Sequence, residues 1–153
     1  MDVEVLYAAF LSKIESDIYK VGLDPEEDKW IYAEWTQFIL SSIHLFKFPR
    51  VSLAMDENNN FLDTKITNSE IQVLSMYMRY FWICQQIDTW ENIKTQYAES
   101  DFSQAPILKE LQNLKKTALE EARYGESIYY RSVGGQPFNY GDLVGKKKRW
   151  KRN

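Results

Sequence analysis

Hydrophobic positions recur at helical spacing over most of the chain. Near the start, steps of three and four residues separate Val3, Leu6, Phe10, Ile14, Ile18 and Val21. This spacing predicts one face of an amphipathic helix that ends at Gly22. A second helix is predicted over residues 25–45, because Asp24 is a favoured N-cap residue and Pro49 prevents continuation. Its inward face would carry Trp30, Ile31, Trp35, Phe38, Ile39 and Ile43.

Residues 50–66 change to an alternating period. Val51, Leu53 and Met55 alternate with small residues, and a second alternating stretch, FLDTKI, follows the polar sequence DENNN. Two alternating stretches around a polar turn are typical of two strands joined by a five-residue loop. We therefore predict a β-hairpin at 50–66.

Two longer helices complete the pattern. Thr67 and Glu70 have the spacing of a capping box, and the helix behind them is predicted over 68–97. The last helix is predicted to begin near Pro106 and to run to Tyr130, with a narrow apolar seam and a charged outer face. The predicted fold class is mainly α: a helical bundle of about four helices with one β-hairpin insertion and an extended C-terminal tail.

Residues 132–153 contain four glycines and a proline and show no hydrophobic period. We predict a helical domain over 1–131 and an extended, basic C-terminal arm over 132–153. Phe138, Tyr140 and Leu143 make the arm too apolar for a plain solvated linker. Segments of this kind often become ordered only on a partner, so we expect the arm to bind another molecule.

Charge is distributed unevenly along the chain. Of the 19 Lys and Arg residues, six lie in 146–153, so the other 145 residues have 13 against all 22 Asp and Glu. An acidic body thus ends in a basic tip that contains Trp150. Three interpretations of this tip remain open: a solvated charge run, a contact with phosphate backbone through charge and stacking, or docking of Trp150 into an acidic groove on a partner subunit.

The residues needed for common catalytic and metal sites are missing. His44 and Cys84 are single and lie on different predicted helices, which leaves no Cys/His nucleophile pair and too few zinc ligands. DENNNFLDTKIT departs from a calcium loop at Phe61, where glycine is needed, and at Thr67, where glutamate is needed. GDLVGKK lacks the spacing and the Ser/Thr of a phosphate loop. We expect no enzyme activity, no metal and no cofactor.

The sequence also predicts a cytoplasmic origin. No run reaches the roughly 18 apolar residues of a membrane span, and MDVEVLYAAFL has acids where a signal peptide needs basic residues. A single cysteine fits a reducing compartment. We expect a protein made in the cytoplasm, with no membrane contact.

Aromatic residues are abundant: five Trp, ten Tyr and eight Phe. An aromatic-rich bundle core explains most of them. Tyr129, Tyr130, Phe138, Tyr140 and Trp150 lie outside the predicted core, and one interpretation makes them anchors for a partner surface. The other interpretation is that the aromatic residues reflect only an aromatic-rich bundle core, which covers most of KWIYAEWTQF and MYMRYFW.

The middle of the chain combines a capped ITNSEIQVL opening, a long helix with the aromatic block MYMRYFW, a QI break, and DF before LKELQNLKK. In this combination, residues 61–131 resemble the neck proteins of tailed bacteriophages, which are head–tail connector, adaptor or head-completion proteins. The resemblance implies a mainly helical virion subunit without catalysis. Twelve copies would form a ring beneath the portal, extend the DNA channel and offer a platform to the next neck or tail component.

The resemblance also implies a role for the arm, since family members commonly reach the portal with an extended C-terminal segment. The expected partner-binding residues, for portal or for packaged DNA, are Phe138, Tyr140, Leu143, Lys146, Lys147, Lys148, Arg149, Trp150, Lys151 and Arg152. The alternative hypothesis is a small nucleic-acid-binding regulator that uses the basic tip. A bundle-type enzyme is a further alternative, and it would require a pocket with paired titratable groups.

Overall fold

The computed structural model of the chain describes residues 3–14, 29–96, 105–133 and 136–137. Over these residues the protein is mainly helical, as predicted. The elements are the helices α1 (Glu4–Leu11), α2 (Lys29–Leu45), α3 (Asn68–Gln96) and α4 (Ala105–Arg131) and the short strands β1 (Ser132–Val133) and β2 (Gln136–Pro137). The predicted bounds of the two long helices are confirmed to within one residue at each described end.

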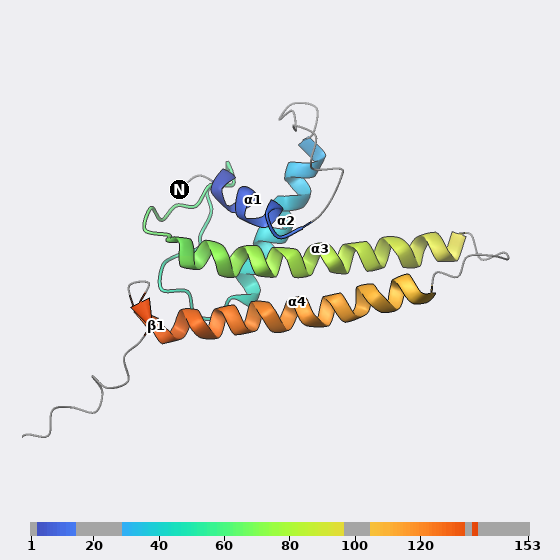
Figure 1. Cartoon of the computed structure of the whole chain (residues 1–153). Helices are drawn as coiled ribbons and strands as arrows, with labels where there is room; N and C mark the ends of the chain where they lie inside the picture. The colour runs from blue at the N-terminus through green and yellow to red at the C-terminus, as the bar shows by residue number, and fades with distance from the viewer. Residues whose placement is uncertain (1–2, 15–28, 97–104, 134–135, 138–153) are drawn as a thin grey trace, which may run out of the picture.

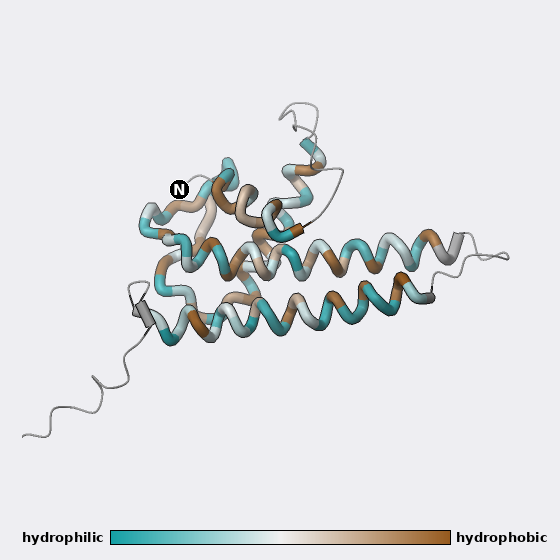
Figure 2. The backbone as a smooth tube through the Cα atoms, in the orientation of Figure 1, coloured by the Kyte–Doolittle hydropathy of each residue, from teal (hydrophilic) through white to brown (hydrophobic). Residues whose placement is uncertain are grey.

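Helix α3 is the centre of the fold. It packs along α4 on one side and contacts α1 and α2 as well (Figure 1). Because α3 has neighbours on several sides, its apolar residues are spread around the helix instead of forming one stripe. Among the described elements, helix α4 packs mainly against α3, and in Figure 2 hydrophilic positions dominate it, with hydrophobic positions at intervals.

Helix α1 is shorter than the hydrophobic spacing predicts. Leu6, Tyr7 and Phe10 are buried as expected, but the helix ends at Leu11. The amide of Lys13 donates to the carbonyl of Phe10 (2.9 Å), which tightens the last turn and stops α-helical bonding. The helix prediction is therefore wrong for residues 12–14. The rest of the predicted helix, 15–22, lies outside the described residues.

Helix α2 buries most of the predicted face, with one exception. Ile31, Trp35, Phe38 and Ile39 are buried, but the Trp30 side chain is 61% exposed. Trp30 and Trp35 are five residues apart, which places them about 140° apart around a helix. Both cannot face the same core, so the prediction for Trp30 is wrong. The predicted start of this helix at Asp24 lies outside the described residues.

The segment 50–66 does not form the predicted two-stranded hairpin. It has one isolated antiparallel bridge, between Met55 and Phe61. The turn is held by Asp56, whose Oδ1 accepts the amides of Asn58 and Asn60 at 2.8 Å each, and Asn59 has a positive φ of 63°. Leu53, Phe61 and Ile66 are buried in the core. Burial and the aspartate turn thus position this segment, and no ladder is needed.

The predicted capping box at the start of α3 forms in part, with the amide of Ser69 in the place predicted for the amide of Glu70. A side-chain oxygen of Glu70, Oε2, accepts the amide of Thr67 at 2.8 Å, and the Thr67 hydroxyl accepts the amide of Ser69 at 3.3 Å. These bonds satisfy donors that a helix start leaves free. The start of α3 is therefore fixed locally by its own sequence.

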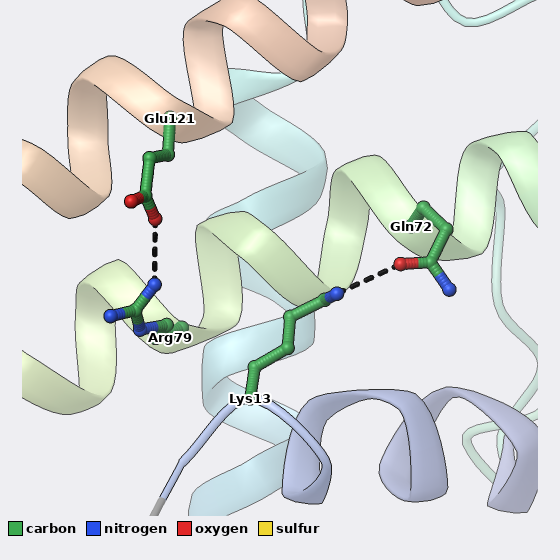
Figure 3. Close-up of polar contacts among 4 residues, drawn as sticks. All are labelled: Lys13, Gln72, Arg79 and Glu121. Atoms are coloured by element: carbon green, nitrogen blue, oxygen red, sulfur yellow. Dashed lines mark hydrogen bonds and ion pairs between the residues drawn. The ribbon is translucent and has the colours of Figure 1, made fainter.

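Polar contacts on the surface tie neighbouring elements to α3 (Figure 3). Lys13 donates to Gln72 at 2.8 Å, and Arg79 pairs with Glu121 of α4 at 2.7 Å. Partial burial, with the positive charge of Arg79 nearby, lowers the pKa of Lys13. Exposed pairs of this kind contribute at most about 1 kcal/mol, so the apolar core holds the helices together.

Candidate functional site at the root of the arm

The ten predicted partner-binding residues lie outside the described residues. They are Phe138, Tyr140, Leu143, Lys146, Lys147, Lys148, Arg149, Trp150, Lys151 and Arg152. The structure does describe how the arm begins. Directly after α4, β1 pairs antiparallel with β2, with Ser132 opposite Pro137 and Val133 opposite Gln136. We call residues 129–137 the arm root.

Glu126 provides one half of a polar cluster next to the arm root. Its side chain is only 7% exposed. One oxygen accepts the hydroxyl of Tyr77 at 2.5 Å, and the other accepts the hydroxyl of Tyr130 and the amide of Lys47 at 3.1 Å. This carboxylate therefore joins α3, α4 and the segment that follows α2.

Glu70 provides the other half. It is 3% exposed, and its Oε1 accepts the hydroxyl of Tyr129 at 2.7 Å. Its Oε2 accepts the amide and the hydroxyl of Thr67. The Tyr129 hydroxyl in turn accepts the amide of Arg50 at 2.7 Å. Both oxygens of both buried carboxylates are thus occupied by donors, as buried polar groups require.

Arg50 completes the cluster at the end of α4. Its guanidinium donates to the carbonyl of Tyr129 at 2.5 Å and to the carbonyl of Ser132. It also lies 4.4 Å from the centre of the Tyr129 ring. A cation here satisfies carbonyls that the helix end leaves free and complements its partial negative charge. We call Glu70, Glu126, Tyr129, Tyr130 and Arg50 the root clamp.

Burial and hydrogen bonding shift the pKa values of Glu70, Tyr129 and Tyr130. Burial, together with the bond to Glu70, raises the pKa of Tyr129 to about 12, and burial with the bond to Glu126 does the same for Tyr130. For Glu70, burial acts to raise the pKa, but hydrogen bonds from Thr67 and Tyr129 outweigh it and hold the pKa below its usual value. The neutral phenol of Tyr129 therefore donates to a charged carboxylate at Glu70.

The clamp corrects one interpretation of the aromatic residues. One of the two interpretations made Tyr129 an exposed partner anchor, but Tyr129 is buried and packs edge-on against Phe46 at 5.1 Å between ring centres. Tyr130 does keep an exposed face, although its hydroxyl is bound inside the clamp. Tyr129 cannot bind a partner without leaving the core.

Sequence reasoning missed Glu126 as a clamp residue. Ala118, Ala122 and Glu126 lie four residues apart on the buried face of α4. An acid on an otherwise apolar stripe is the signal that could have found it, because such an acid requires buried donors.

Other site chemistry was sought in the part of the chain that the structure describes. Its His, Cys, Asp and Glu side chains form no group of three or more that could hold a metal ion. Cys84 is a free, half-buried thiol. None of the described helices combines the length and the apolar character that crossing a membrane requires.

Comparison with known proteins identifies no relative. No protein-family model matches the chain, and searches of the curated proteins and of the solved structures gave no match. The function is therefore argued from the clamp, the arm and the sequence.

We expect the stability of the protein to depend on pH through Glu70 of the root clamp. Folding lowers the pKa of Glu70. The contribution of its carboxylate to the free energy of unfolding is therefore fully present above the unfolded-state pKa of about 4.3, and it is lost as the pH falls through the folded-state pKa. We expect the Glu70→Gln variant to be less stable at neutral pH and to lose less further stability on acidification. Denaturant midpoints measured from neutral pH down to about pH 3 test this. Parallel curves for the two proteins would contradict it.

Proposed function

We propose that this protein is a structural virion subunit, an adaptor in the neck of a tailed bacteriophage. Copies of it form a ring, with twelve as the expected number, that joins the portal to the next neck or tail component and extends the DNA channel. The observation that carries the proposal is the attachment of an aromatic, basic arm to an acidic helical body through a clamped root.

The clamp supports this proposal because an arm that must reach a partner benefits from a fixed starting point. Arg50 binds the carbonyls on both sides of the junction between α4 and β1. The start of the arm at Ser132 is therefore already fixed before any partner binds. Ordering fewer residues on binding costs less conformational entropy, which improves affinity without additional contacts.

The resemblance of residues 61–131 to phage neck proteins supports the same proposal. This stretch includes both long helices, α3 and α4. A channel built from the acidic body would repel a DNA duplex and let it slide. The arm would then contact the portal through the ten partner-binding residues, with Trp150 as the central anchor of the basic tip.

Removal of residues 134–153 tests the proposal. We expect the truncated protein to keep its helical signal and its denaturant midpoint, because the clamp lies before the cut, and to lose assembly with the portal protein of the same phage. Native mass measurement of the particle, alone and with the portal protein, gives the number of copies in the ring and shows whether the truncated protein has lost assembly with the portal. Unchanged assembly of the truncated protein would overturn the proposed role of the arm.

A matched pair of full-length variants separates adaptor from nucleic-acid regulator. Replacing the six basic residues of the tip by glutamine, with Trp150 kept, removes only charge. If the protein is a regulator, the unaltered chain binds duplex DNA with an affinity that falls steeply with salt, and the charge variant loses that dependence. If the protein is an adaptor, the unaltered chain and the charge variant both bind DNA weakly, and the loss of the six charges changes the affinity for the portal protein instead.

A further inference from the structure

Helix α4 has a line of exposed apolar side chains that is separate from its buried positions. The line consists of Ile107, Leu114, Tyr124 and Ile128, with exposed fractions between 38% and 66%. The first, second and fourth are spaced by multiples of seven residues, and Tyr124 precedes Ile128 by four, so all of them lie along one stripe of the helix. In Figure 1, α4 lies on the outer side of α3, away from α1. We call these four residues the α4 stripe.

Helix α2 has a similar stripe on its outer surface. Steps of three and four residues separate Trp30, Ala33, Gln37, Leu40 and His44, and all five are exposed. Trp30 and Leu40 are large and apolar. Single exposed apolar residues are common on monomeric proteins, but two exposed stripes with this spacing are typical of helices that pack on other helices. We call these five residues the α2 stripe.

The two stripes match when the helices run antiparallel. With Leu40 of α2 opposite Leu114 of α4, the step of ten residues back to Trp30 equals the step of ten residues forward to Tyr124. Trp30 then lies opposite Tyr124, so each large apolar residue of the α2 stripe meets one of the α4 stripe. Tyr and Trp are side chains that interfaces favour. Both stripes are exposed within the single chain, so they can pack on each other only between two copies.

The polar residues select the antiparallel direction. In this alignment His44 lies opposite Glu110, an exposed residue beside the α4 stripe, since each lies four residues from the leucine of its own helix. An imidazole N–H can donate to the carboxylate there. A parallel alignment that also matches the large apolar residues puts His44 opposite Ile128, where the imidazole would be covered without a hydrogen-bond partner.

We infer that the α2 stripe of one copy packs antiparallel on the α4 stripe of a second copy. Because the two surfaces are different, each copy can bind one neighbour through α2 and another through α4. Such a head-to-tail contact closes into a ring when its rotation permits. The inference deepens the proposed function, because it assigns the contact between neighbours in the adaptor ring. It rests on that function for the closure of the ring, and on the two stripes for the contact itself.

The size of the contact indicates when it forms. From Trp30 to His44 the α2 stripe is about 21 Å long, and a helix is about 10 Å wide, so the footprint is about 200 Å². A stable dimer usually buries about 800 Å² on each partner. The dilute protein is therefore expected to be a monomer with Trp30 exposed. The contact forms at high concentration or on assembly, because closure of a ring gives each copy a second contact.

Disulfide trapping of the full-length chain tests this inference. Two variants in a Cys84→Ser background are mixed at high concentration, one with Leu40→Cys and the other, made heavier by a tag, with Leu114→Cys. We expect mild oxidation to give a mixed dimer in several-fold excess over the dimer of either variant with itself. Opposed positions of closely packed helices lie near enough for a disulfide. Absence of the mixed dimer would overturn the inference.

Further thiol positions test the surface and the direction. Gln112→Cys places a thiol at an exposed position about 160° away from Leu114 around α4, and it should not trap Leu40→Cys. Tyr124→Cys should trap Trp30→Cys in preference to Leu40→Cys. The reverse preference would show parallel helices and overturn the inference. A dimer of Leu114→Cys with itself as abundant as the mixed dimer would show a symmetric contact between two α4 helices, which also overturns it.

Failure of this contact and failure of the proposed function give different results. If native mass shows a ring of copies with the portal protein but the mixed disulfide is absent, the adaptor function stands and the contact between α2 and α4 is wrong. If the mixed disulfide forms but the portal protein is not bound, the contact stands and the proposed function is wrong.

Discussion

Replacing Trp35 by alanine is expected to destabilise the protein by about 4 kcal/mol, as is typical for removing a buried indole from a core. Trp35 is 1% exposed and lies where α1 and α2 meet. Its ring contacts those of Tyr7 at 5.0 Å, Tyr32 at 5.4 Å and Phe10 at 6.1 Å between centres. No neighbour can fill the space without leaving its own aromatic contacts, so the cavity remains.

Trp30→Ala is the matched control for this variant. It removes the same side chain from the same helix at a position exposed to solvent. We expect a change within about 0.5 kcal/mol, as for most surface substitutions. Guanidinium unfolding followed by circular dichroism, at one protein concentration, measures both. Equal losses for the two variants would mean that Trp30 is buried in the protein in solution, for example in an interface between copies.

The second large effect is expected at Glu126. Its replacement by alanine leaves the hydroxyls of Tyr77 and Tyr130 and the amide of Lys47 without their acceptor. Unsatisfied buried donors cost about 1–3 kcal/mol each where water cannot reach them. Because Tyr130 and Lys47 are partly open to water, we expect a total near 3 kcal/mol. We also expect the segment after α2 to detach from α4 first.

Two variants provide controls for the Glu126 result. Glu126→Gln keeps the side-chain volume and one acceptor oxygen, so it should cost less than alanine. Glu120→Ala removes an exposed carboxylate from the same helix and should be nearly neutral. Hydrogen exchange locates the effect, since the amide of Lys47 should lose protection in Glu126→Ala. An unchanged rate at Lys47 would show that the clamp does not hold this segment.

The predicted hairpin at 50–66 shows why some elements cannot be assigned from a pattern. Alternating hydrophobicity indicates which residues face a core, and Leu53 and Phe61 do face it. The same alternation arises in a strand and in an irregular segment laid on helices. Strand formation also requires a ladder of several bridges, and this segment has a single bridge, between Met55 and Phe61.

The sequence by itself determined the two long helices and their described ends, because period, caps and prolines act within a few residues of each other. Thr67 and Glu70 are three residues apart, and the predicted bond from the Thr67 amide to the Glu70 carboxylate formed. It also determined that the body is acidic and the tip basic. These properties do not depend on how the helices pack.

Only the tertiary structure decided the root clamp. Glu126 and Tyr77 are 49 residues apart, Glu70 and Tyr129 are 59 apart, and Arg50 and Ser132 are 82 apart. No local pattern links such residues, since their contacts exist only after α2, α3 and α4 have packed. The same packing buried Tyr129. Side chains that a sequence places in separate elements acquire a shared role only when burial forces them to satisfy one another.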